Sequence, residues 1–341
     1  MKWKLCPGRH GGASMQIGKN TNQKTAAGKQ SHFIDVVKKI KRNVPTYILL
    51  APTLILFLVM GVYPIIWALK YCLYNYDGTT IPIYVGLENF KKLFNFKAIL
   101  SESGNPYAVY WASWGRTLAY AVIKTLIEIP LSFFCALFVT SKIKGRTFFK
   151  TLFYMPQILP SFAIFMVFTI MLNPFNGILT KYMANIGAVP QFYNFLANTK
   201  SAFIVGILAD AWIYFGLNML FFIAGLTNIP KDVYESASMD GANDFQRLRY
   251  ITIPMMARMG QVIIMLSLVG CLKAMGSYFI MTKGGPNHAT ELTFLYIYNL
   301  FFPSGTTAQY GMGAAVAVVS AVIVGIITVI YNVVTEKMQY D

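Results

Sequence analysis

Long apolar stretches, separated by short polar segments, dominate the chain from residue 46 onward. Six of them are poor enough in charge and long enough to cross a bilayer core, which takes about 20 residues of helix. They cover residues 46–69, 117–140, 151–173, 201–226, 259–282 and 310–335. Because backbone groups in lipid must be hydrogen-bonded within their own segment, we predict helices rather than strands. The pattern therefore predicts an all-α membrane protein with six transmembrane helices.

The remaining segments divide the chain into two predicted regions. Residues 1–45 are rich in Lys, Gly and Gln and poor in apolar residues, so we predict a basic, disordered cytoplasmic tail. Residues 46–341 form the predicted six-span transmembrane domain. The apolar run 294–303 is too short to span, and we expect it at an interface or in a loop. Met15 is an alternative start to Met1.

The distribution of Lys and Arg indicates the orientation of the chain. With the N-terminus inside, the predicted cytoplasmic segments hold 19 of these residues, against eight in the predicted external segments. Positive residues accumulate on the cytoplasmic side of membrane proteins. We therefore predict a multi-pass protein of the cell membrane with both termini in the cytoplasm.

Composition agrees with this class and narrows the function. Hydrophobic residues make up 56% of the chain and charged residues 12%, against about 25% charged in soluble domains. The net charge of +16 fits attraction to the anionic inner leaflet. We predict no nucleic-acid partner, because no basic soluble domain or binding module is present. The four cysteines show no metal-ligand spacing, so we expect neither a metal site nor a disulfide framework.

A polar block of twenty residues, from Glu235 to Pro254, separates the fourth and fifth windows and reads ESASMDGANDFQRLRYITIP. Its charge density excludes it from hydrocarbon. Pro230 suits the first turn of a helix, Asp232 complements the positive helix end, and Gly241 suits a C-terminal stop. We therefore predict two short helices that meet at Gly241. An ordinary charged loop is the alternative interpretation.

Signatures of catalysis are missing from the sequence. The chain has no GxSxG, HExxH or GxxxxGK[ST] motif. We therefore predict that it is not an enzyme, binds no cofactor, and relies on partner subunits for any ATP hydrolysis.

Ionisable residues inside spans are costly and are therefore candidates for function. Lys124 and Glu128 lie one helical turn apart, and we expect them to neutralise each other. Asp210 has no such neighbour in sequence and shares a helix face with Tyr214 and Asn218. This polar stripe is typical of a water-filled path, with burial against another helix as the alternative.

The polar block resembles the cytoplasmic EAA loop of permease subunits of ATP-binding-cassette importers, whose pattern is roughly EAAxxDGA followed by LP. The matching residues are Glu235, Ala237, Asp240, Gly241, Ala242 and Pro254, whereas Ser236 and Ile253 replace an Ala and a Leu. Residues 281–302, MTKGGPNHATELTFLYIYNLFF, are similar to the carbohydrate-uptake branch of that family, the maltose and multiple-sugar type. The resemblance covers about residues 45–335.

The resemblance implies a permease subunit that moves sugars or oligosaccharides across the membrane by alternating access. The implied partners are a second permease subunit in a heterodimer, two ATPase subunits that bind ATP-Mg, an extracytoplasmic solute-binding protein and membrane lipid. The six matching loop residues would couple the permease to the ATPases. The residues implied for the substrate path are Asp210, Trp212, Tyr214, Asn218 and Ser267.

Three alternatives remain open at this point. The same type of importer could carry a polyol, glycerol phosphate or another small solute. A secondary transporter would need internal repeats and interrupted helices, which the sequence does not display. A membrane enzyme acting on lipid-linked sugars would need carboxylates or histidines at one span end, and these are missing. The sequence does not identify the sugar, its chain length or the partner subunits.

Overall fold

A computed structural model describes residues 43–95, 106–141 and 143–337. The predicted basic tail lies almost wholly outside the described residues. The chain forms two units, Met1–Trp67 and Ala68–Asp341. The described part of the first unit is helical and consists of α2 (Val44–Phe57), the π-helical turn η1 (Leu58–Val62) and the start of α3 (Tyr63–Tyr71). These segments together are long and apolar enough to span a membrane, as predicted for the first window.

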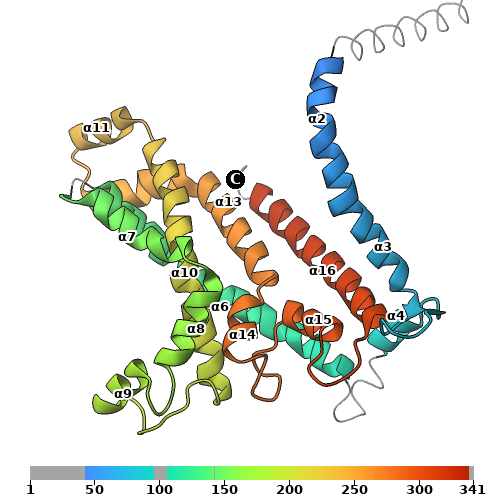
Figure 1. Ribbon diagram of the computed structural model, residues 1–341. Helices are drawn as coiled ribbons and strands as arrows, with labels where there is room; N and C mark the ends of the chain where they lie inside the picture. The colour runs from blue at the N-terminus through green and yellow to red at the C-terminus, as the bar shows by residue number, and fades with distance from the viewer. Residues whose placement is uncertain (1–42, 96–105, 142, 338–341) are drawn as a thin grey trace, which may run out of the picture. The chain divides into compact units, whose positions relative to one another are not determined.

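The second unit is almost entirely helical. Its helices are α4 (Glu88–Leu93), α6 (Pro106–Thr140), α7 (Arg146–Ile158), α8 (Ser161–Met171), α9 (Ile178–Asn185), α10 (Thr199–Thr227), α11 (Lys231–Met239), α12 (Asp244–Arg247), the π-helical turn η2 (Leu248–Thr252), α13 (Ile253–Leu272), α14 (Gly276–Met281), α15 (Thr293–Phe301) and α16 (Tyr310–Lys337). In this unit α11 lies at one end, and α9, α14 and α15 lie at the other (Figure 1).

A small antiparallel hairpin, β1 (Tyr74–Asn75) and β2 (Ile83–Tyr84), follows α3. Asp77 closes its loop by accepting hydrogen bonds from the backbone of Thr79 and from the backbone and hydroxyl of Thr80. These bonds stabilise the carboxylate and hold the pKa of Asp77 well below its usual range. The loop is therefore fixed by local hydrogen bonds rather than by apolar packing.

Five helical stretches in the described residues are long and apolar enough to cross a membrane, and they correspond to five of the six predicted windows. The remaining window, 151–173, is not one straight helix, because α7 and α8 meet there at an angle of 92°. Leu159 between them is extended, since it precedes Pro160 and the residue before a proline disfavours the helical conformation. The bent pair makes a sixth span only if its two arms cross the membrane together.

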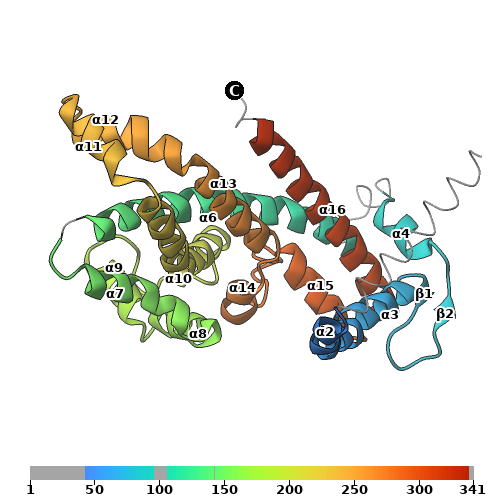
Figure 2. The same ribbon diagram turned by 90° about the horizontal axis from the view of Figure 1, so that it is seen from above.

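α10 lies between α6 and α7 (Figure 2) and packs against α6, α7 and α13. Gly216 permits the close approach of α7. A Cβ at this position would lie 3.0 Å from Tyr154 Cα and closer still to the carbonyl oxygen of Phe153. On the side of α13, Met219 of α10 and Ile263 of α13 are buried in one apolar cluster. The packing of α10 against its neighbours therefore depends on close backbone approach as well as on apolar side chains.

α6 begins at Pro106, well before the predicted window at 117–140. The charge of Arg116 limits that window in sequence, but the helix continues through it. The guanidinium of Arg116 donates to the carbonyl oxygens of Glu291 (3.0 Å) and Val109 (3.3 Å). Because Arg116 is only half-buried and two of its donors are bonded, its charge is tolerated in the helix. The bond to Glu291 also attaches α6 to the loop before α15.

Candidate functional site

A cavity of about 590 Å³ lies among α6, α8, α10, α13 and α14. Its polar lining consists of Tyr120, Lys124, Glu128, Ser161, Asp210, Tyr214, Asn218, Ser267 and Lys273. Apolar side chains, including Phe165, Phe221 and Leu266, complete the wall. This size, with a few convergent polar groups in an apolar wall, is typical of small-molecule sites.

Asp210 is buried in the cavity wall and is held by two hydroxyl donors. Tyr120 Oη of α6 donates to Asp210 Oδ2 across 2.7 Å, and Ser277 Oγ of α14 donates to the same oxygen across 2.5 Å. Among the described residues, no donor bonds the other oxygen, Oδ1. The protein thus orients Asp210 and leaves one acceptor for a ligand hydroxyl.

Lys124 and Glu128 form a buried ion pair in the same cavity, with 2.5 Å between Nζ and Oε2. Asn218 Nδ2 donates to the other carboxylate oxygen, Glu128 Oε1. The Lys124 ammonium also lies 4.7 Å from the centre of the Tyr214 ring. The prediction that Lys124 and Glu128 neutralise each other is confirmed. Because both oxygens of Glu128 are engaged, Asp210 is the carboxylate with a free acceptor.

The structure brings together four of the five residues predicted for the substrate path: Asp210, Tyr214, Asn218 and Ser267. Trp212 does not line this cavity. Its ring packs edge-on against Phe168, with the centroids 5.8 Å apart, and its side chain is exposed elsewhere on α10. Successive helical residues point about 100° apart, so Trp212 and Tyr214 face different sides.

Sequence reasoning missed three groups at the cavity. Tyr120 lies one turn before Lys124, so helical spacing was a signal that would have found it. Ser277 follows the break between α13 and α14, and no periodicity connects it with Asp210. Lys273 lies at that break, lines the cavity and forms no ion pair with a described residue. The described part of the chain groups no three His, Cys, Asp or Glu side chains that could hold a metal ion.

The first of the two predicted short helices is confirmed as α11, and Gly241 separates it from α12. The prediction of a second short helix is wrong, because α12 continues without a break through η2 into α13. Gly241 has φ +78°, a conformation that favours glycine. The amide of Ala242 donates to Ala237 O (2.9 Å) and that of Gly241 donates to Ser238 O (3.2 Å). This is the Schellman pattern of helix termination. Asn243 then begins α12 with a capping box that includes Gln246.

The polar segment presents most of its predicted residues to the surface. Glu235, Asp240, Gly241 and Pro254 are exposed, Ala242 is half-buried and Ala237 is buried. Three large side chains, Met239, Phe245 and Tyr250, are exposed by 88%, 70% and 71%. Glu235 forms no ion pair with any described residue. Exposed apolar side chains gathered beside unpaired charge are typical of a surface that binds another protein.

Residues 128–340 match the protein family described as the binding-protein-dependent transport system inner membrane component. The matched region contains α11 and α12 and most of the cavity-lining residues.

Curated relatives match over most of their length. The chain is 31% identical to the probable ABC transporter permease protein YesP of Bacillus subtilis (strain 168), over 85% of this chain and 90% of the relative. It is 27% identical to the trehalose/maltose transport system permease protein MalF of Thermococcus litoralis, over 84% of this chain and 91% of the relative. The arabinooligosaccharides transport system permease protein AraP of Bacillus subtilis (strain 168) is also 27% identical, over 89% of this chain and 92% of the relative.

A solved structure has the same fold. A bacterial ABC transporter involved in the import of the acidic polysaccharide alginate superposes with a TM-score of 0.75 at 23% identity. The match covers 89% of this chain and 99% of the alginate transporter chain.

Proposed function

The chain belongs to the family of binding-protein-dependent transport system inner membrane components, and we propose that it is one permease subunit of an ATP-driven importer of sugars or oligosaccharides. The names of the maltose and arabinooligosaccharide relatives support the cargo class. The proposal includes six spans, cytoplasmic termini, a second permease subunit, two ATPase subunits and an external solute-binding protein. A similar fold in an alginate transporter complexed with a pentasaccharide-bound periplasmic protein supports the last of these partners.

One observation carries the proposal: the exposed polar segment lies directly between the two helices that flank the cavity. α10, which holds Asp210, ends at Thr227, and α11 begins at Lys231. From α12 the chain continues through η2 into α13, which holds Ser267. At 1.5 Å per helical residue, a shift of α11 is carried along α10 over roughly 25 Å to Asp210.

The chemistry of the cavity suits a hydroxyl-rich ring. Asp210 Oδ1 accepts from a sugar hydroxyl, and the Tyr214 ring offers a flat apolar face for the ring carbons. The neutralised pair of Lys124 and Glu128 fixes Asn218 and Tyr214 around this position. These groups bind and orient the sugar, and no covalent chemistry is required of this chain.

The exposed side of the polar segment forms a coupling surface, which consists of Glu235, Met239, Gly241, Phe245 and Tyr250. We infer that this surface docks in a groove of an ATPase subunit. A cleft of about 280 Å³ between the turn that follows α11 and η2, lined by Gly241 and Tyr250 among others, suits a side chain of that partner. Closure of the ATPase pair then moves α11 as a rigid body, and the bundle alternates between inward-facing and outward-facing states.

Reconstituted vesicles that contain this chain with its partner permease and ATPases test the proposal. We expect ATP-dependent sugar uptake that requires the external solute-binding protein. Uptake of glycerol 3-phosphate without competition by sugars would favour the alternative cargo, which is that named for the 27% identical permease UgpA of Salmonella typhi. Uptake driven by a proton or sodium gradient without ATP would contradict the importer assignment.

A further inference from the structure

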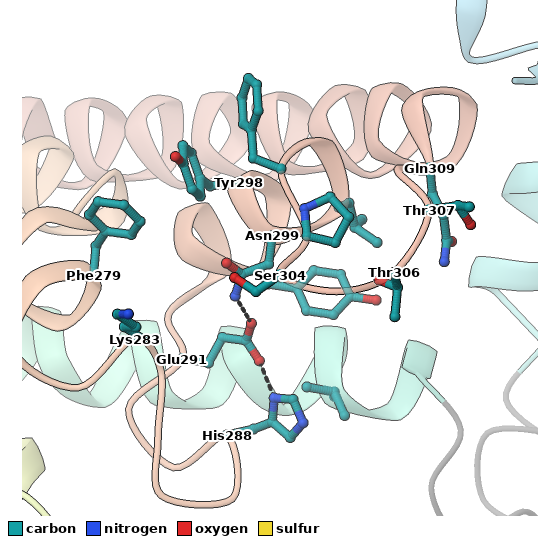
Figure 3. A pocket seen from close by; sticks show the side chains of 15 residues that line it. Phe279, Lys283, His288, Glu291, Tyr298, Asn299, Ser304, Thr306, Thr307 and Gln309 are labelled. Carbon is teal, nitrogen blue, oxygen red and sulfur yellow. Dashed lines mark hydrogen bonds and ion pairs between the residues drawn. The ribbon is translucent and has the colours of Figure 1, made fainter. Parts of the chain in front are cut away.

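A second cavity, of about 680 Å³, lies at the end of the second unit opposite to α11. Its walls come from α14, the loop 282–292, α15 and the loop 302–309 (Figure 3). In the proposed orientation this end faces the outside of the cell. The cavity is separate from the one around Asp210, with which it shares no lining residue.

One part of its lining is aromatic. The rings of Phe279 and Tyr298 lie edge to face with centroids 4.8 Å apart, and the rings of Tyr298 and Phe302 have centroids 5.0 Å apart. Phe302 is exposed, although a buried position would suit its apolar ring better. Three adjoining aromatic rings give this cavity a continuous apolar surface on which a ligand ring can pack.

A buried carboxylate organises the polar part of the lining. Glu291 is only 3% exposed. Asn299 Nδ2 donates to Glu291 Oε1 across 2.6 Å, and His288 Nδ1 lies 2.5 Å from Glu291 Oε2 (Figure 3). Glu291 therefore fixes the direction of the Asn299 amide and leaves its carbonyl oxygen available to accept a hydrogen bond.

Two further polar side chains of this cavity are available to a ligand. Lys283 and Gln309 line it, and in the described residues no partner bonds either side chain. Burial, reinforced by the nearby Glu291 carboxylate, raises the pKa of Tyr296 well above its usual value. Its hydroxyl therefore stays protonated and uncharged. The lining combines amide, ammonium and hydroxyl groups with an aromatic surface.

The loop that carries these groups has an unfavourable backbone. Lys283, Asn287 and His288 have φ of 52°, 45° and 59°, and in the described chain only Phe192 is a further non-glycine residue with positive φ. Conformations of this kind persist where the surroundings enforce them, and they concentrate at ligand sites.

We propose that this cavity is an external saccharide subsite, which binds one end of the cargo before it reaches the cavity around Asp210. One sugar ring packs on Tyr298 and Phe302, while Asn299, Gln309 and Lys283 bond its hydroxyl or carboxylate oxygens. The volume lies in the range of small-molecule pockets, 300–1,000 Å³. This inference rests on the proposed function, from which it takes the ligand class.

Protection of an introduced cysteine tests the subsite directly. The complete importer, with its native cysteines replaced by alanine and without the solute-binding protein, carries Ser304→Cys in the cavity wall. A water-soluble maleimide labels it with and without maltotriose, arabinotriose or trigalacturonate. We expect one of these sugars to slow labelling about fivefold at a concentration of about four times its Kd. Thr79→Cys, exposed in the hairpin loop, is the matched control and should react at an unchanged rate.

Tyr298→Ala added to the Ser304→Cys variant should abolish the protection, because it removes the centre of the aromatic surface. Unchanged labelling of Ser304→Cys with all three sugars overturns the subsite, whether or not vesicles transport sugar. If sugar-free binding protein protects Ser304→Cys and none of the three sugars does, the subsite is also overturned and the cavity is assigned to protein docking. Protection by sugar in an importer that takes up no sugar would refute the proposed function and leave the subsite standing.

Discussion

Ser277 Oγ donates a hydrogen bond to Asp210 across 2.5 Å and thereby joins α14 to α10 over 67 residues of sequence. The same carboxylate oxygen accepts from Tyr120 of α6. Asp210 thus connects three helices around the cavity. A motion of the bundle must either move α14 and α10 together or break this bond. Asp210 is therefore sensitive to the conformational state of the bundle.

Asp210→Leu should abolish sugar uptake or reduce it at least about tenfold, because it removes the free acceptor and leaves two buried hydroxyl donors unsatisfied at a cost of about 1–3 kcal/mol each. Uptake by reconstituted vesicles measures this, and co-purification of all subunits shows whether assembly is intact. Asp210→Asn, which retains one acceptor oxygen, is the control and should retain more activity. Normal uptake with normal affinity in Asp210→Leu would show that the residue serves packing alone.

Lys124→Met should destabilise the chain by about 3–5 kcal/mol, because it leaves the buried carboxylate of Glu128 without its counter-charge. The midpoint of thermal unfolding in detergent measures this. The double variant Lys124→Met with Glu128→Gln removes both charges and should recover most of the loss. Equal unfolding midpoints of the single and double variants would mean that the charges of Lys124 and Glu128 do not stabilise each other in the folded chain.

Gly216→Ala should lower the unfolding midpoint by an amount equivalent to about 1–3 kcal/mol, since its Cβ would meet backbone atoms of α7 that cannot move independently. Gly115→Ala in α6 is the matched control. A Cβ at Gly115 meets nothing within 4 Å, so helix propensity alone should make this change neutral or stabilising by about 0.5–1 kcal/mol. Indistinguishable midpoints for the two variants would contradict the close approach of α7 and α10.

Gly241→Asp should weaken docking of the ATPase subunits, because φ +78° strains any side chain there and the new carboxylate enters the coupling surface. Glu235→Gln should also weaken docking, since a charge-assisted bond to a partner contributes about 1.5–3 kcal/mol. Co-purification of the ATPases and stimulation of ATP hydrolysis by loaded binding protein measure both effects. Pro254→Ala tests whether this further residue of the matching pattern, which lies in α13, also contributes to docking. Intact complexes and full stimulation of ATP hydrolysis in the Gly241→Asp and Glu235→Gln variants would show that the polar segment only connects α10 to α13.

The purified chain alone should not hydrolyse ATP, because it contains no phosphate-binding loop. Phosphate release from the isolated subunit measures this, and the assembled complex is the positive control. ATP hydrolysis that persists through repeated purification, at a rate proportional to the amount of this subunit, would contradict the proposal that only the ATPase subunits hydrolyse ATP.

The sequence by itself determined the features that depend on local chemistry. The length of each apolar stretch located the helical windows, because a segment that lies in lipid must form its backbone hydrogen bonds within itself. Gly241 predicted the end of α11, since few other residues adopt positive φ readily. The pairing of Lys124 with Glu128 followed from a spacing of one helical turn.

Tertiary structure alone decided which helix faces meet. Ser277 reaches Asp210 only because α13 ends at Leu272 and α14 begins at Gly276 beside α10, and no periodicity spans that break. The resemblance implied that Trp212 lies on the substrate path, but the rotation of α10 directs it to Phe168 and away from the cavity around Asp210. Helical spacing specifies which residues share a face, whereas the neighbour of that face depends on packing among segments distant in sequence.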